Sequence, residues 1–103
     1  MIHTLLAARQ GDAVSTGHDC DSATVLAIPS QSTVFAEAKL WCRIGDLTVS
    51  HDILKELLCV SHTAPINEGS GTVFVVGIGC ARLEDGADAG SITGSAITVY
   101  AGD

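Results

Sequence analysis

The sequence predicts a small, mainly β domain built from three related units. The prediction rests on strand-like composition, a thin core and an internal repeat. Short runs of Val, Ile and Thr alternate with Gly, Ser and Asp, which is typical of short strands joined by tight turns. The chain is 47% hydrophobic but only 4% aromatic, so its core must be thin and aliphatic. Its 103 residues suffice for one core, and we expect residues 1–103 to form a single domain.

The internal repeat is marked by all three arginines of the chain. They stand in AARQGD, WCRIGD and CARLED, each followed two and three residues later by Gly-Asp or Glu-Asp. A second marker, STVF, GTVF and ITVY, ends at Phe35, Phe74 and Tyr100. Each unit should contain a small turn, two short strands and a Gly-Asp turn, with the N-terminal LLAARQGD supplying the missing half of the third unit. Three units joined in this way form a closed ring.

Several local patterns carry expectations of their own. The repeated Asp is expected to accept hydrogen bonds from backbone N–H groups of its turn, and the Arg to bridge neighbouring units. The run TVFVV, residues 72–76, is apolar on both faces, so it should be sandwiched or docked on a partner. The stretch DILKELLC, residues 52–59, has apolar residues at near-helical spacing for about two turns and is equally compatible with a strand.

Net charge and the N-terminus bound the function and the redox environment. Twelve acidic against five basic residues give a net charge of −7, which leaves no cationic surface for nucleic acid or anionic lipid. Neither a signal peptide nor an apolar run of ~20 residues is evident, so we expect synthesis in the cytosol, where disulfides are a poor first expectation. Cys42 and Cys80 lie in apolar surroundings without a nearby His, and we expect packed core thiols there.

The other two cysteines lie close to histidines. TGHDCD contains His18 and Cys20, TVSHD contains His51, and CVSH contains Cys59 and His62. A Cys-x-x-His pair can reach one ion from a single turn, and His-x-Cys places both side chains on the same side of an extended segment. These five candidates predict one tetrahedral, structural zinc with a spare thiol. Its binding free energy would compensate for the thin core.

A catalytic zinc is the alternative that the residues leave open. Asp19, Asp21 and Asp52 adjoin the candidate ligands and would serve as a general base beside an open coordination position. A thin array of strands offers little volume for a substrate cleft, so we expect no enzyme. His3 lies away from the other histidines and is expected at the surface.

The order of these motifs resembles that of PAAR-repeat proteins, a family named for a Pro-Ala-Ala-Arg motif, over nearly the whole chain. The resemblance is carried by TGHxC, by SH after the second Gly-Asp, by CxxH before GSGTVF, and by DAGSITGSAITVYAG at the end. It implies a small conical PAAR-type fold of short β-hairpins with pseudo-three-fold repeats and a zinc near the apex. The eponymous proline is absent, and Leu6, Leu40 and Gly79 stand near its place.

Family members typically hold the zinc with three His and one Cys. Carried over by position, the resemblance implies a site formed by His18, His51, Cys59 and His62. Cys20 competes with Cys59 for the thiol place. Ala89 stands where many members carry Cys or His, which shifts weight to His51 as the fourth ligand.

Members of this family cap the trimeric β-helical spike of contractile injection machines and sharpen it for puncturing a target envelope. The resemblance therefore implies a structural protein that binds as one monomer per spike trimer and contacts the target membrane transiently, without nucleic acid or a small-molecule substrate. A phage tail baseplate is favoured, with the chain at the virion tail tip. A type VI secretion spike, exported from the bacterial cytoplasm, is the alternative. A small zinc-dependent hydrolase or sensor is the second alternative.

The same resemblance orients the molecule. We expect the strands around Thr33–Phe35, Thr72–Val76 and Thr98–Tyr100 to lie toward a broad base that docks on the spike, with Trp41 packed near it. Only AGD follows Tyr100, so no toxin domain is expected.

Overall fold

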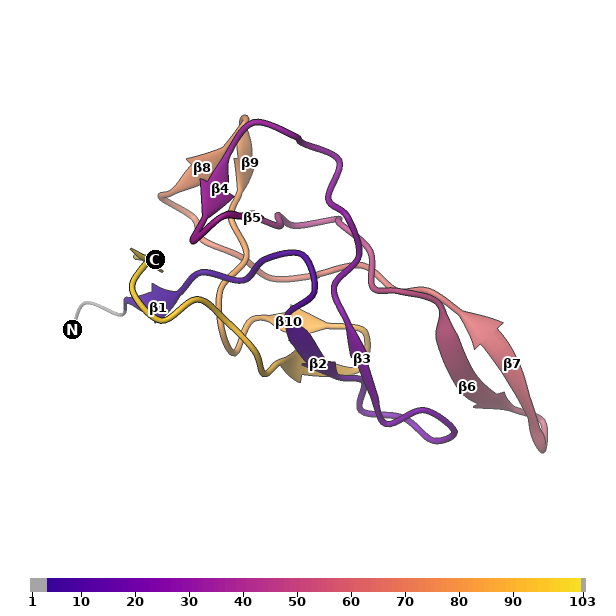
Figure 1. The fold of residues 1–103 in the computed structure, drawn as a ribbon. Coiled ribbons are helices and arrows are strands. Elements are labelled where there is room, and N and C mark those ends of the chain that lie inside the picture. Colours follow the sequence, from indigo (N-terminus) through magenta and orange to yellow (C-terminus); the bar gives the residue numbers. More distant parts are fainter. Residues whose placement is uncertain (1–3, 103) are drawn as a thin grey trace.

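The computed structural model describes residues 4–102, which form short antiparallel strands with no helix among them (Figure 1). The prediction of a mainly β domain is confirmed. His3, expected at the surface, lies outside the described residues. The strands are β1 (Leu5–Leu6), β2 (Ala13–Ser15), β3 (Ala23–Val25), β4 (Phe35–Ala36), β5 (Lys39–Leu40), β6 (His51–Lys55), β7 (Leu58–His62), β8 (Phe74–Val75), β9 (Ile78–Gly79), β10 (Gly86–Ala87), β11 (Gly90–Ile92) and β12 (Tyr100–Ala101).

Three two-stranded pairs, β4–β5, β8–β9 and β1–β12, have equivalent registers. The aromatic residue of each repeated marker, Phe35, Phe74 or Tyr100, stands opposite the residue three positions before the repeated arginine of its unit. The third pair joins the two ends of the described chain, because β12 pairs with β1. The N-terminal segment therefore completes the third unit, as predicted.

A cycle of three backbone hydrogen bonds closes the units into a ring. The N–H of Ala8 donates to the C=O of Ala81 (3.0 Å), Cys42 donates to Ala8 (3.0 Å), and Ala81 donates to Cys42 (2.9 Å). All three residues are fully buried. Each unit thus satisfies a buried backbone group of the next, which makes the closure of the ring cooperative.

The core contains one large aliphatic side chain from each unit. Leu26, Ile66 and Ile92 are each 1% exposed and pack together with the ring residues. The backbone N–H of each donates to the C=O of its unit's turn Asp, at 2.9 Å in all three cases. The core is therefore thin, as the composition predicts, and the backbone ladder determines where its side chains lie.

Cys42 and Cys80 are fully buried free thiols, as predicted. Burial raises the pKa of Cys42 to about 12 and that of Cys80 to about 11. Both residues therefore remain protonated and behave as small apolar side chains.

The repeated arginine and aspartate form the same turn in every unit. The carboxylate of the Asp accepts a hydrogen bond of 2.7–2.8 Å from the backbone N–H of the Arg. The residue before the Asp has a positive φ, which is 85° at Gly11, 93° at Gly45 and 76° at Glu84. The third unit therefore places a side chain where the other two units use glycine.

The arginines bridge neighbouring units, as predicted. Arg9 donates to the C=O of Ser95 (3.2 Å), and Arg82 donates to the C=O of Gly102 (2.7 Å). Arg43 reaches a backbone C=O of β8 at 3.4 Å. Each guanidinium also lies 2.9–3.6 Å from the carboxylate of its own turn, so these nearly buried charges are paired.

Beyond the ring, each unit contributes an insertion, and the longest is the β6–β7 hairpin. Residues 52–59 lie within this hairpin, so the choice between helix and strand is resolved in favour of strands. A two-residue turn, Glu56 and Leu57, reverses the chain with φ values of 50° and 74°, which matches the twist of the strands it joins. The hairpin projects from the body at the end away from β4 and β8 (Figure 1).

We expect opposite effects from exchanging the turn residue in two units. Gly45→Ala should lower the free energy of unfolding by about 1 kcal/mol, because Ala is disfavoured at positive φ. Glu84→Gly should raise it by roughly 0.5 kcal/mol, because relief of the same strain exceeds the entropy cost of glycine. Urea unfolding curves measure both changes. Shifts of the same sign would contradict the equivalence of the three turns.

Candidate metal centre

Three histidines and one aspartate gather where the insertions of the three units meet. The group, here called the apex cluster, consists of His18, His51, His62 and Asp88, with one ligand atom of each within 4.8 Å of the others. His18 belongs to the first unit, His51 and His62 to the second, and Asp88 to the third. A single ion held by all four side chains would therefore join all three units.

Local backbone structure positions each side chain of the apex cluster. The register of β6–β7 places His51 directly opposite His62 at the open end of the hairpin. His18 lies in the loop between β2 and β3, which Thr16 closes with a side-chain hydrogen bond of 2.7 Å to a backbone C=O. Asp88 lies in the tight turn between β10 and β11 with a φ of 57°, a conformation that Asp tolerates better than most residues.

Asp88 contacts all three histidines. Its Oδ2 atom lies 2.8 Å from Nε2 of His18 and 2.8 Å from Nε2 of His51, and its Oδ1 atom lies 3.3 Å from Nε2 of His62. The Nε2 atoms of His18 and His51 are 3.2 Å apart. In a tetrahedral zinc site with bonds of ~2.0–2.1 Å, ligand atoms are separated by about 3.3 Å. The separations in the apex cluster are of this size.

The protonation of two rings follows from their outer contacts. Nδ1 of His51 lies 2.8 Å from the C=O of Val49, and Nδ1 of His18 lies 3.1 Å from the C=O of Asp19. A carbonyl oxygen only accepts hydrogen bonds, so both Nδ1 atoms carry protons and both Nε2 atoms face the cluster. Two Nε2 lone pairs at 3.2 Å repel each other unless a proton or a metal ion lies between them. The arrangement is therefore suited to a cation.

The pKa shifts show the same demand for positive charge. Burial lowers the pKa of His18, but hydrogen bonds to the Asp19 carbonyl and to Asp88 outweigh it, so the pKa lies above its ordinary 6.5. Burial raises the pKa of Asp88, but hydrogen bonds from His18, His51 and His62 outweigh it, so the pKa lies below its ordinary 3.8. The carboxylate of Asp88 is thus kept ionised beside groups that can bind either protons or a metal.

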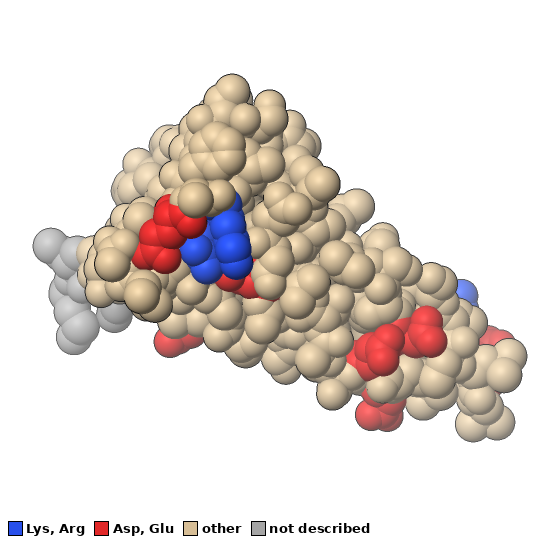
Figure 2. Space-filling model, in the orientation of Figure 1, with Lys and Arg blue, Asp and Glu red and all other residues tan. Residues whose placement is uncertain are grey.

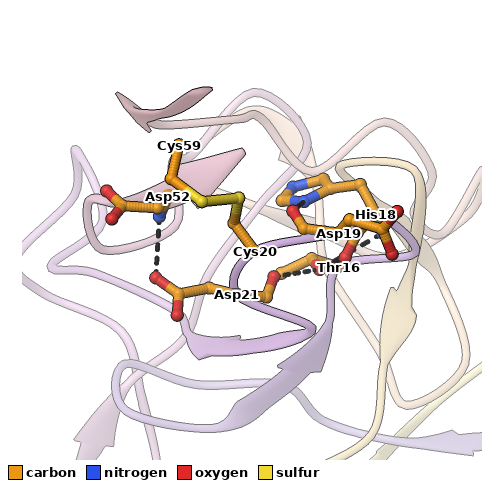
Figure 3. Close-up of a disulfide and its surroundings, with 7 residues drawn as sticks. All are labelled: Thr16, His18, Asp19, Cys20, Asp21, Asp52 and Cys59. Carbon is orange, nitrogen blue, oxygen red and sulfur yellow. Dashed lines mark hydrogen bonds between the residues drawn. A yellow bond between two sulfur atoms is a disulfide. The ribbon is translucent and has the colours of Figure 1, made fainter. Parts of the chain in front are cut away.

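The structure corrects the expectation for Cys59, which the sequence placed among the metal ligands. Its sulfur is bonded to that of Cys20 in a disulfide beside the apex cluster (Figure 3). Three of the four predicted ligands come together, and Asp88 stands where a thiolate was expected. The expectation of free thiols failed because Cys20 forms a β-bridge with Ile53, which brings two cysteines 39 residues apart into contact.

Asp88 was not predicted, because no pattern of ligand spacing surrounds it. The repeat contains the signal that could have found it. When the units are aligned on their Gly-Asp turns, the short β10–β11 turn occupies the position of the two histidine-bearing insertions. The family resemblance drew attention to Ala89, the next residue along the chain.

The acidic residues considered for a catalytic site instead build the surroundings of the apex cluster. Asp21 accepts a hydrogen bond of 2.7 Å from the backbone N–H of Asp52, and Asp19 offers its carbonyl to His18 (Figure 3). A cavity of about 360 Å³ beside Ile28 and Leu47 is lined by no member of the cluster.

A scan against protein-family models found no match, and a search of curated proteins found none either. Within the part of the chain that the structure describes, no helix is long and apolar enough to cross a membrane. Function must therefore be inferred from the fold, the apex cluster and the surface.

Removing the carboxylate from the apex cluster should weaken metal binding selectively. We expect the protein to bind one zinc per chain, and Asp88→Asn to raise the dissociation constant by at least about 100-fold, because a charged ligand is lost. Competition with a chromophoric chelator measures the constant. Asp52→Asn is the matched control, since it removes an equal charge from a neighbouring exposed residue. Equal effects of the two substitutions would contradict the ligand set.

The stability of metal-free protein should depend on pH through the same groups. The raised His18 pKa contributes stability that is complete below about pH 6.5 and is lost as pH rises through the folded-state value. The lowered Asp88 pKa contributes stability that is complete above about pH 3.8 and is lost as pH falls through the folded-state value. With a chelator present, the melting temperature should therefore fall between about pH 6 and 8.

Zinc should reverse this trend, because a metal competes with protons for the imidazoles and its stabilisation grows as pH rises. Parallel thermal melts with zinc and with chelator, across the same pH series, compare the two states. A zinc-induced shift that shrank with rising pH would count against imidazole ligands.

Proposed function

We propose that this chain is a structural, non-enzymatic protein that caps and sharpens the trimeric β-helical spike of a contractile injection machine. A phage tail is the favoured machine, and a type VI secretion spike is the alternative. The observation that carries the proposal is a division between two ends of the molecule. One end presents three equivalent hairpins with exposed aromatic residues, and the molecule narrows toward the β6–β7 hairpin at the other (Figures 1 and 2).

The docking face would consist of β4–β5, β8–β9 and β1–β12. Phe35, Phe74 and Tyr100 occupy equivalent positions on these hairpins and are 56%, 60% and 58% exposed. They are three of the four Phe, Tyr and Trp residues in the chain, so aromatic surface is concentrated on this face. Exposed aromatic patches are typical of protein interfaces. A face that offers one contact three times suits a partner made of three identical subunits.

The fourth aromatic residue supports these hairpins from inside. Trp41 is only 8% exposed, and its Nε1 donates to the C=O of Ala81 (2.9 Å). It packs in one cluster with Ala36, Val75 and Ala101, which come from the three hairpins. The hairpins are thus held in fixed relative positions, which favours a preformed docking face.

The end of a trimeric β-helix explains why such a cap is needed. Each of the three chains ends in an unpaired strand edge, and exposed edges favour aggregation. Three short hairpins in one chain can cover three edges that are related by three-fold symmetry. The hairpins around Phe35 and Phe74 also show few charged atoms on the face seen in Figure 2, in keeping with contacts that are mainly apolar and backbone in nature.

The opposite end would be the leading tip. The described chain extends over 42 × 31 × 22 Å and ends in the β6–β7 turn, where Leu57 is 93% exposed and Leu58 is 67% exposed. For a given driving force, pressure rises as the contact area falls, so a narrow tip favours penetration. Two leucines at its end lower the cost of first contact with the hydrocarbon of a bilayer.

The apex cluster would stiffen this tip. Sites with four protein ligands are usually structural, whereas catalytic zinc keeps a position open for water. The cluster supplies four ligands, and they come from all three units. A metal there would hold together insertions that bury little apolar surface of their own.

Binding to a purified candidate spike trimer tests the proposal. Phe74→Asp should weaken binding at least about 100-fold, because it buries a charge in an apolar interface. Leu57→Asp is the matched control at the opposite end and should leave spike binding unchanged. Pull-down and mass measurement of the complex give the affinity and the stoichiometry, which should be one chain per trimer. Full binding by Phe74→Asp would contradict the assigned face.

A further inference from the structure

The Cys20–Cys59 disulfide links two elements that carry the three histidines of the apex cluster. Cys20 lies two residues after His18 in the loop between β2 and β3, and Cys59 lies in β7, three residues before His62. Both cysteines are exposed, as are all other residues of β7 except His62. The loop and the hairpin therefore have little buried apolar surface to hold them together.

Only a few polar contacts support the disulfide. The N–H of Asp21 donates to the C=O of Asp52 (3.0 Å), and the N–H of Asp52 donates to the carboxylate of Asp21 (2.7 Å). Figure 3 shows these groups beside the disulfide, with the ring of His18 on the other side of Cys20. Both residues are exposed, and hydrogen bonds at such positions add little net stability because water competes for the same groups.

We propose that Cys20 and Cys59 form a thiol–disulfide exchange site whose redox state controls the metal affinity of the apex cluster. This inference rests on the proposed metal-bearing apex and adds a means of regulating it. The oxidised pair holds His18 beside the hairpin histidines, so the metal finds its ligands already in position. The reduced pair leaves the loop attached by exposed hydrogen bonds alone, and metal binding must then restrict the loop at an entropic cost.

The chemistry requires a dithiol reductant in one direction and a disulfide oxidant in the other. A thiolate of the reductant attacks one sulfur of the pair, and the other cysteine leaves as a thiolate and takes up a proton. The second thiol of the reductant then releases the first cysteine, which gives two protein thiols and one reductant disulfide. Oxidation by a small disulfide reverses these steps and yields two small thiols. The exposure of both sulfur-bearing residues gives such reagents access.

The redox environment would then determine the state of the tip. In a thiol-rich cytosol the pair is reduced and the apex binds its metal weakly. In an oxidising compartment or outside the cell the pair closes and the apex binds its metal tightly. The tip would thus become rigid after it leaves the compartment of synthesis.

Metal affinity of the oxidised and reduced full-length chain tests the inference. Protein is reduced with a phosphine, freed of reagent without air, and titrated with zinc against a chromophoric chelator. We expect the reduced protein to have a dissociation constant at least about 10-fold higher than the oxidised protein. The double substitution Cys20→Ser and Cys59→Ser should match the reduced protein. Equal or tighter zinc binding after reduction would overturn the inference.

Cobalt distinguishes the proposal from the ligand set expected from the sequence. If a freed Cys59 thiolate enters the metal site, reduced protein loaded with Co²⁺ gains an intense sulfur-to-cobalt band in the near ultraviolet, and the proposal is wrong. If the ligands remain three imidazoles and a carboxylate, reduced and oxidised protein show the same visible bands and no such band. The double serine variant provides the baseline, because it has no thiol near the apex cluster.

Two controls keep these outcomes interpretable. Cys42 and Cys80 are fully buried, so iodoacetamide should label two cysteines in the reduced chain and none in the oxidised chain. Labelling of four would mean that reduction unfolds the core, which overturns a local effect at the apex. Spike binding is measured on the same samples through the distant hairpins around Phe74. Loss of the redox effect with intact spike binding rejects only this inference, and the converse rejects only the proposed function.

Discussion

The closure of three short units into a ring is the constraint on which the rest of this structure depends. Most strands have two or three residues, and isolated pairs of that length are not stable in water. They persist here because Ala8, Cys42 and Ala81 bond to one another in a cycle that buries every partner. Once the ring is closed, the insertions of the three units converge. Convergence brings His18 and Asp88 to 2.8 Å although 70 residues separate them.

The repeat made the ring predictable from sequence. The arginines and the TVF-like markers recur in order, and the ends of the chain carry complementary halves of one unit, so the pairing of β1 with β12 followed directly. The turn at Glu84 shows what the repeat concealed, since a residue type unlike glycine adopts the same positive φ there. Periodicity alone could not assign residues 52–59, because a two-residue turn divides them into strands too short to show alternation.

The apex cluster was predictable only in part, for a related reason. His51 and His62 stand opposite each other because of hairpin register, and His18 is marked by its neighbouring cysteine, so residue types near one another in sequence revealed three ligands. Asp88 contributes from a turn without any local signature. Cys59 was misassigned because spacing shows which atoms can reach an ion but not which partner they meet first. The β-bridge of Cys20 to Ile53 decides that, and it is a tertiary contact.

The central claim is that one cation joins the three units through imidazoles and a carboxylate at the apex. Anomalous diffraction from crystals grown with zinc, recorded on both sides of the zinc absorption edge, tests it most directly. The account predicts one strong anomalous peak per chain, bonded to His18, His51, His62 and Asp88, with Cys20 and Cys59 still joined. A peak bonded to the sulfur of Cys59, or the absence of any peak among these four side chains, would contradict it.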